Sequence, residues 1–232
     1  MKTTPSLPVL LVTAVALIAA SAGPSSALEL SESRIYIEYN QSGNDLGYHV
    51  SLDGEDWKRL KIVNPNGTRI FEVKGYAAYQ DLGMTELFFE GAEPNLDEFP
   101  LEDLLALFPE GEYEFEGVTV DNETIEGEGT LSHAVPNGPG DVTAVLGASN
   151  SLVISWDAVT THPDGFPERP ISIVGYQLIV ESFQVTVPAS VTSVTVSPEF
   201  VGSLPSGEVL FEVLAIDVSG NQSITESSFV KP

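Results

Sequence analysis

GEYEFEGVTV, residues 111–120, alternates glutamates at positions 112, 114 and 116 with the aromatic residues Tyr113 and Phe115. A period of two places the glutamates on one face of a β-strand and the aromatic residues on the other. ETIEGEGTL, residues 123–131, follows directly after Asp121-Asn122. The two segments therefore predict an antiparallel β-hairpin, whose first strand has an apolar face and an acidic face.

Further strand patterns precede this hairpin, at residues 34–39, 48–52, 60–63, 69–73 and 85–89. One helix interrupts them, because four apolar residues recur at i, i+3, i+4 and i+7, namely Leu101, Leu104, Leu105 and Phe108. Pro100 suits a first helical position and Pro109 ends the run. We therefore expect residues 28–136 to form an antiparallel β domain with one short helix.

Seven turn-bounded apolar segments follow in about 90 residues, a spacing that is typical of a β-sandwich. They are residues 141–146, 151–156, 173–181, 184–187, 191–196, 209–218 and 222–230. Pro136-Asn137-Gly138-Pro139-Gly140 separates the two halves and fits neither a helix nor a strand. The sequence predicts an all-β protein with a linker at 137–140 and a seven-stranded sandwich at 141–232.

Three motifs in the second half resemble those of fibronectin type III domains. SLVISWD (151–157) resembles the second strand with its buried tryptophan, GYQLIV (175–180) resembles the third strand, and FEVLAIDVSGN (211–221) resembles the sixth strand and its turn. The resemblance implies an immunoglobulin-like sandwich that acts as a spacer or protein-binding module. The tyrosine usual near the start of the sixth strand is replaced here by Val209 or Leu210.

The first half resembles exported bacterial proteins of unknown function. The similar pieces are NDLGYHV (44–50), LDGE (52–55), GMTELFFE (83–90) and LFPEGEY (107–113). This resemblance implies export and a β-rich fold, and it brings no known activity.

The N-terminus has the pattern of a secretory signal peptide. Lys2 precedes the 14-residue apolar run 7–20, which is shorter than the roughly 20 residues of a membrane-spanning helix. Small residues allow cleavage before Leu28 or before Gly23, and we favour Leu28 because the polar chain starts there. We therefore expect a signal peptide at 1–27 and a chain exported to the periplasm or the extracellular space, with no transmembrane segment after cleavage.

Charge and composition exclude several classes of function. The 232 residues include 34 acidic and 9 basic residues, for a formal charge of −25, and no cysteine. Phosphate-rich nucleic acids would be repelled, and disulfides, thiol catalysis and cysteine-based metal sites are excluded. The charge is uneven, because residues 81–128 contain 16 acids and no base. The first half is therefore the acidic half.

Two groups of carboxylates are the candidates for chemistry. The row of Glu112, Glu114 and Glu116 could bind Ca²⁺ or supply an acid–base pair for glycoside hydrolysis, although a solvated strand face explains it more simply. Asp45, Asp53 and Glu55 could also supply oxygen ligands, although Asp53-Gly54 is a common turn pair and no EF-hand loop is present. No cofactor is expected, and calcium is the metal ion that these carboxylate oxygens would suit.

The other reactive residue types indicate no site. His49, His133 and His162 lie far apart, and His49 fits an ordinary strand position. No G-x-S-x-G, P-loop or G-x-G-x-x-G motif occurs. Trp57 could be an exposed contact residue, but a core position is favoured, and Trp156 is expected in the sandwich core.

The sequence thus favours a non-catalytic binding or scaffold protein with a protein or carbohydrate partner outside the cell. Two alternatives stay open: a small secreted carboxylate-dependent hydrolase and a calcium-dependent adhesion protein. Asp217 and Asn221, on either side of Gly220, are interpreted as turn residues that bond local backbone groups.

Overall fold

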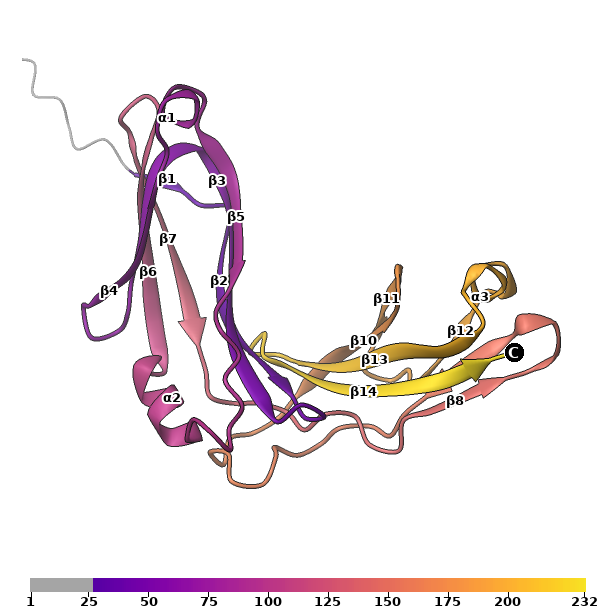
Figure 1. Ribbon diagram of the computed structural model, residues 1–232. Coiled ribbons are helices and arrows are strands. Elements are labelled where there is room, and N and C mark those ends of the chain that lie inside the picture. Colours follow the sequence, from indigo (N-terminus) through magenta and orange to yellow (C-terminus); the bar gives the residue numbers. More distant parts are fainter. Residues whose placement is uncertain (1–26) are drawn as a thin grey trace, which may run out of the picture.

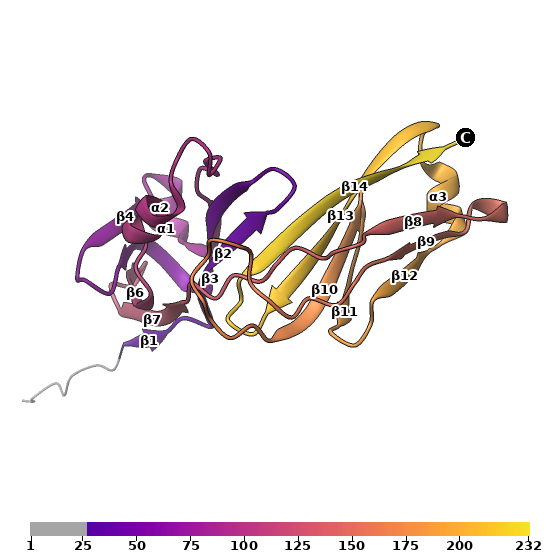
Figure 2. The same ribbon diagram turned by 90° about the horizontal axis from the view of Figure 1, so that it is seen from below.

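The computed structural model describes residues 27–232 (Figure 1). The predicted signal peptide, apart from Ala27, lies outside the described residues. The chain forms two β-rich lobes that meet at a bend, and a second view shows the molecule to be elongated (Figure 2). No helix among the described residues is long and apolar enough to cross a membrane.

The first lobe contains seven strands and two helices in chain order. They are β1 (Leu28–Glu29), β2 (Glu32–Asn40), β3 (Asp45–Val63), β4 (Arg69–Lys74), α1 (Ala78–Leu82), β5 (Met84–Glu90), α2 (Leu101–Leu107), β6 (Gly111–Thr119) and β7 (Thr124–Leu131). The predicted hairpin is confirmed as β6–β7, which pair in antiparallel register from Gly111↔Leu131 to Val118↔Thr124. The predicted helix is confirmed as α2, whereas α1 was not expected.

The strand β3 determines the shape of this lobe, because its two ends belong to different parts of the sheet. Residues 45–53 pair with β2 and β5, and residues 59–63 pair with β4 and β6. The register shifts between them mark a bulged bend, which curls the sheet around one hydrophobic core. The interpretation of Asp53-Gly54 as a turn was therefore wrong, since both residues lie within the strand.

Trp57 lies at this bend and is fully buried in the first core. The core position favoured from the sequence is thus confirmed, and Trp57 is no surface contact. Leu104 of α2 is buried in the same core, and Leu101, Leu105 and Phe108 pack against it. The apolar stripe of α2 therefore closes the first core as its spacing predicted.

The second lobe is a two-sheet β-sandwich. Its strands are β8 (Thr143–Leu146), β9 (Leu152–Ser155), β10 (Ile173–Val180), β11 (Phe183–Pro188), β12 (Ser193–Val196), β13 (Gly207–Asp217) and β14 (Gln222–Lys231), with the short helices η1 (Ala148–Asn150) and α3 (Pro198–Ser203). All seven predicted segments contain a strand. One sheet has the order β12-β9-β8, and β14-β13-β10-β11 form the facing layer.

Apolar side chains from the two layers form a second core. Trp156 is buried there, with its ring centroid 5.5 Å from that of Tyr176. The Tyr176 hydroxyl accepts a hydrogen bond from the Val159 N–H (2.8 Å). The sandwich core predicted for Trp156 is thus confirmed.

A single sheet connects the two lobes. Strand β14 of the second lobe pairs in parallel with β2 of the first, through the register Gln222↔Glu38 to Ile224↔Asn40. The strand order β1-β7-β6-β3-β2-β14-β13-β10-β11 therefore runs without interruption from one core to the other. Backbone pairing makes this junction part of the sheet rather than a flexible tether.

The segment predicted as a linker packs into the junction. Pro136, Gly138 and Pro139 are buried. The Pro136 carbonyl accepts a hydrogen bond from Ser223 Oγ (2.6 Å), and the Gly138 N–H donates to Gln41 Oε1 (2.8 Å). These residues have no regular secondary structure, as their proline and glycine content predicted. Hydrogen bonds to Gln41 of the first lobe and Ser223 of the second lobe hold them in place.

Asn221 is the polar centre of the junction and is fully buried. Its Oδ1 accepts a hydrogen bond from the Ile37 N–H (2.8 Å), and its Nδ2 donates to the carbonyl oxygens of Ser132 (2.7 Å) and Ala134 (3.0 Å). One side chain thereby satisfies three backbone groups of the first lobe. The prediction that Asn221 bonds local backbone was therefore wrong, whereas Asp217 does bond nearby groups, including the Ser219 N–H (2.9 Å).

Replacing Asn221 by alanine should destabilise the chain strongly. The variant leaves three backbone groups at the junction without their partner, so the free energy of unfolding should fall by about 2–4 kcal/mol. Denaturant unfolding of N221A checks this value. N66A is the matched control, because Asn66 is exposed, and it should change stability by less than about 0.5 kcal/mol. Equal stability of N221A and N66A would contradict the role of Asn221.

Candidate functional site

The shared sheet has one face that neither core covers, on the inner side of the bend (Figure 1). Pairing sets the order of the side chains there. Tyr36 of β2 lies opposite His49 of β3, His49 lies opposite Glu90 of β5, and Glu38 of β2 lies opposite Gly47. A polar and aromatic cluster therefore forms beside the junction, from strands that are distant in the sequence.

His49 is the centre of this cluster and is 5% exposed. The Tyr36 ring stacks on the imidazole with centroids 4.9 Å apart, and the Phe88 ring lies at 5.8 Å in a tilted arrangement. Neither ring nitrogen has a hydrogen-bond partner among residues 27–232. The imidazole is thus held in place by aromatic packing, with its polar atoms unsatisfied.

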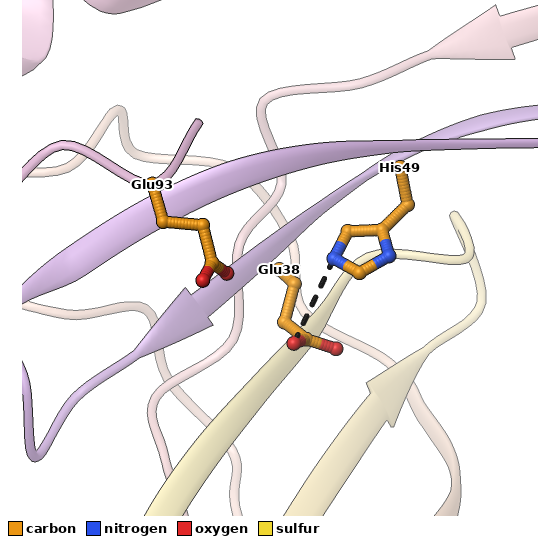
Figure 3. A group of neighbouring side chains, drawn as sticks. All are labelled: Glu38, His49 and Glu93. Atoms are coloured by element: carbon orange, nitrogen blue, oxygen red, sulfur yellow. Dashed lines mark ion pairs between the residues drawn. The ribbon is translucent and has the colours of Figure 1, made fainter. Parts of the chain in front are cut away.

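Two glutamates point toward this imidazole (Figure 3). Glu38 Oε1 lies 3.7 Å from His49 Nε2, and one ligand atom each from Glu38, His49 and Glu93 lie within 4.8 Å of one another. Gly47 leaves the space for Glu93, because a Cβ at position 47 would lie 2.7 Å from Glu93 Cγ. We call Glu38, His49 and Glu93 the junction cluster.

Glu90 adds a third carboxylate at the edge of the junction cluster. Its Oε1 lies 3.9 Å from His49 Nε2. The Gln222 side chain of β14 donates a hydrogen bond to Glu38. The second lobe therefore contributes a neutral hydrogen-bond partner to Glu38, while Glu38, Glu90 and Glu93 all come from the first lobe.

Burial and mutual repulsion shift the titration of these groups. Burial, together with Glu90, Glu212 and Asp45, raises the pKa of Glu38 to about 7, against the opposing hydrogen bond from Gln222. Burial and the neighbouring Glu90 raise the pKa of Glu93 to about 7. Burial lowers the pKa of His49. The cluster therefore combines an imidazole that favours its neutral form with carboxyl groups that repel one another when charged. A bound cation would relieve this repulsion.

The residues predicted as calcium ligands do not converge on one point. Asp45 begins β3 and its pKa is raised by burial and by Glu226. Asp53 lies opposite both Glu32 and Glu86, and Glu55 lies in the bulged part of β3. None of these three belongs to the junction cluster.

The acidic row of β6 faces a second acidic row on β7. Glu114 lies opposite Glu128, Glu116 lies opposite Glu126, and Glu112 lies opposite Thr130. Lys61 Nζ bonds to Glu116 Oε2 at 2.9 Å. Glu114 and Glu116, with Glu126 and Glu128, line an open depression of about 670 Å³. The predicted acidic face of the hairpin thus exists and is more acidic than the β6 pattern alone indicated.

The other two histidines have structural roles. The His133 N–H donates to Glu110 Oε1 (2.7 Å), and His133 Nε2 lies 2.8 Å from the Phe108 carbonyl oxygen. His162 Nδ1 lies 3.0 Å from the carbonyl oxygen of Pro163. His49 lies beside glutamates rather than beside the other histidines, in a group that the sequence did not indicate.

Comparisons with known proteins assign neither a family nor a function to this chain. No protein-family model matches the chain, and no curated protein matches it. Among solved structures, the spore cortex lytic enzyme SleM of Clostridium perfringens is similar over 41% of this chain and 28% of that chain, with 20% identity and a TM-score of 0.34. A tetra-tandem repeat from the extending region of a large adhesion protein is similar over 87% of this chain and 50% of that chain, with 11% identity and a TM-score of 0.29.

A third structure, from a 1.5-MDa bacterial ice-binding adhesin, is similar over 89% of this chain and 65% of that chain, with 15% identity and a TM-score of 0.27. The chain spans less than two thirds of the length of each of these three structures. Likenesses at these TM-scores carry no argument about fold or function.

Replacing Glu38 by glutamine should change how stability depends on pH. The pKa of Glu38 rises from its ordinary value near 4.5 to about 7 on folding. Below about pH 4.5 the Glu38 carboxyl is protonated in both the folded and the unfolded chain. As the pH rises to about 7 the unfolded chain loses this proton more readily than the folded chain, so stability is lost. E38Q removes this loss, so it should be more stable than the parent by about 1–3 kcal/mol at pH 8 and about equal at pH 4.5.

Denaturant unfolding in the presence of a chelator measures this difference at both pH values. His49, whose lowered pKa acts in the opposite direction, is present in both chains, so its contribution largely cancels. A difference that does not change between pH 4.5 and pH 8 would contradict the raised pKa of Glu38.

Proposed function

We propose that the chain is an exported, non-catalytic binding protein, in which a fibronectin type III-like sandwich supports the acidic lobe and the α1 end makes the contact with a protein partner. The exposed apolar segment at α1 is the observation that carries this proposal. Tyr76, Tyr79 and Leu82 are 71%, 59% and 73% exposed. We call these three residues the α1 patch.

The α1 patch lies at the end of the first lobe that is far from the sandwich (Figure 1). Tyr79 and Leu82 are three residues apart on α1, so their side chains lie on neighbouring positions of the helix. Large apolar side chains exposed together within seven residues mark an interaction site more often than single exposed residues do. Tyrosine is enriched in protein interfaces because its ring is apolar and its hydroxyl is polar.

The chemistry of the α1 patch favours a protein over a sugar. Leu82 offers aliphatic surface, which gains free energy when it is buried against apolar protein and gains little from a hydroxyl-rich ring. Lys74 lies over the Tyr76 ring, with Nζ 5.3 Å from the centroid, and Arg59 and Lys74 line an adjacent depression of about 220 Å³. This end thus combines apolar and cationic groups within an acidic chain.

The continuous sheet supports a scaffold role for the rest of the molecule. Because β2 pairs with β14 and Asn221 bonds the first lobe, the α1 patch is held at a fixed position relative to the sandwich. A rigid connection limits the loss of conformational freedom on binding. This supports a module that presents a contact surface at one end.

A pull-down tests the proposal. Residues 28–232 are immobilised and exposed to the envelope fraction and the culture medium of the organism that produces the protein. The double variant Tyr76→Ser, Tyr79→Ser is treated in parallel. The parent chain should retain one partner in about equimolar amount, and the double variant should retain about tenfold less, because the loss of two interface aromatics costs at least about 1.4 kcal/mol.

The double variant Leu210→Ser, Val230→Ser is the matched control. Both residues are exposed, at 66% and 71%, and lie in the second lobe, so partner retention should match the parent. Retention of polysaccharide instead of protein would contradict the choice of partner. Release of sugars from the envelope fraction by the chain would favour the hydrolase alternative and contradict a non-catalytic function.

A further inference from the structure

We propose that the junction cluster, Glu38, His49 and Glu93, together with Glu90, binds one Zn²⁺ ion. This site goes beyond the binding function proposed for α1, since it lies beside the junction with the sandwich. It uses none of the six residues that the sequence indicated for calcium.

The spacing of the donor atoms fits zinc. In a tetrahedral site with bonds of about 2.1 Å, neighbouring ligand atoms lie about 3.4 Å apart. His49 Nε2 lies 3.7 Å from Glu38 Oε1 and 3.9 Å from Glu90 Oε1, and the ligand atoms of the junction cluster lie within 4.8 Å of one another. Small rotations of glutamate side chains are enough to close these distances, because Glu90 and Glu93 are exposed on one side.

The unsatisfied imidazole distinguishes this cluster from an ordinary group of surface acids. His49 is 5% exposed, and its ring nitrogens have no hydrogen-bond partner within the described part of the chain. A buried polar group without a partner costs about 1–3 kcal/mol. Nε2 points toward the carboxylates (Figure 3), so a metal ion between them would satisfy this nitrogen.

The surroundings hold the imidazole ready for ligation. Tyr36 stacks on the ring and Phe88 lies beside it, which fixes the direction of Nε2 before any ion arrives. Gln222 holds Glu38 from the side of the second lobe. Such outer contacts orient ligands and strengthen metal binding.

The donor set selects the ion. A neutral imidazole with carboxylates suits zinc and related divalent ions, whereas Ca²⁺ prefers six to eight oxygen ligands. The two or three carboxylates around the imidazole repel one another, and the positive charge of a bound divalent ion relieves this repulsion. The acidic row of Glu114, Glu116, Glu126 and Glu128 has oxygen donors only, so we assign it no zinc.

Calorimetric titration of the purified, chelator-treated chain with Zn²⁺ tests the site. One ion should bind per chain, and Ca²⁺ at the same concentration should bind at least about tenfold more weakly. E93Q and E38Q should each weaken Zn²⁺ binding by about tenfold or more. E86Q is the matched control, because Glu86 lies on the same face of β5 as Glu90 and the substitution removes the same charge. The E86Q variant should bind Zn²⁺ like the parent.

Imidazole nitrogen NMR provides a readout that does not depend on mutation. The chain has three histidines, and only the ring signals of His49 should shift when one equivalent of Zn²⁺ is added. His133 and His162 serve as internal controls. Each of three results would overturn the proposal: unchanged His49 signals, equal weakening by E86Q and E93Q, or equal binding of Zn²⁺ and Ca²⁺.

Discussion

The buried amide of Asn221 is the interaction on which the arrangement of the two lobes depends. It bonds the Ile37 N–H and the carbonyl oxygens of Ser132 and Ala134, all of which belong to the first lobe. Only a side chain with both a donor and an acceptor group can satisfy all three. The parallel pairing of β2 with β14 follows directly after it in the sequence, so the turn that carries Asn221 also sets the register of the shared sheet.

This register explains why a polar cluster forms beside the junction. Continuation of the sheet brings Gln222 next to Glu38, while both cores lie on the opposite face. His49 is buried on the uncovered face by Tyr36 and Phe88 rather than by a core. Burying a titratable group among carboxylates lowers the stability of the fold. Groups whose pKa is shifted in this way occur more often at functional sites.

Local patterns predicted most of the elements and little of their assembly. Period-two alternation identified β6, the turn at Asp121-Asn122 identified β7 as its partner, the apolar stripe identified α2, and all seven sandwich segments contain strands. The bend in β3 could not be predicted, because Asp53-Gly54 favours a turn locally and tertiary pairing keeps it in the strand. The junction cluster was missed because Glu38, His49 and Glu93 share no sequence motif and meet only through strand register and a loop.

Amide hydrogen exchange at Ile37 tests the central claim that Asn221 and the shared sheet unite the two lobes. The Ile37 N–H bonds to Asn221 Oδ1 and is therefore released only when the junction opens. We predict that it exchanges as slowly as the slowest amides of the two cores, with a free energy of opening equal to that of global unfolding. Exchange of Ile37 at a free energy several kcal/mol below the global value would show that the lobes separate while each stays folded, and would contradict the account.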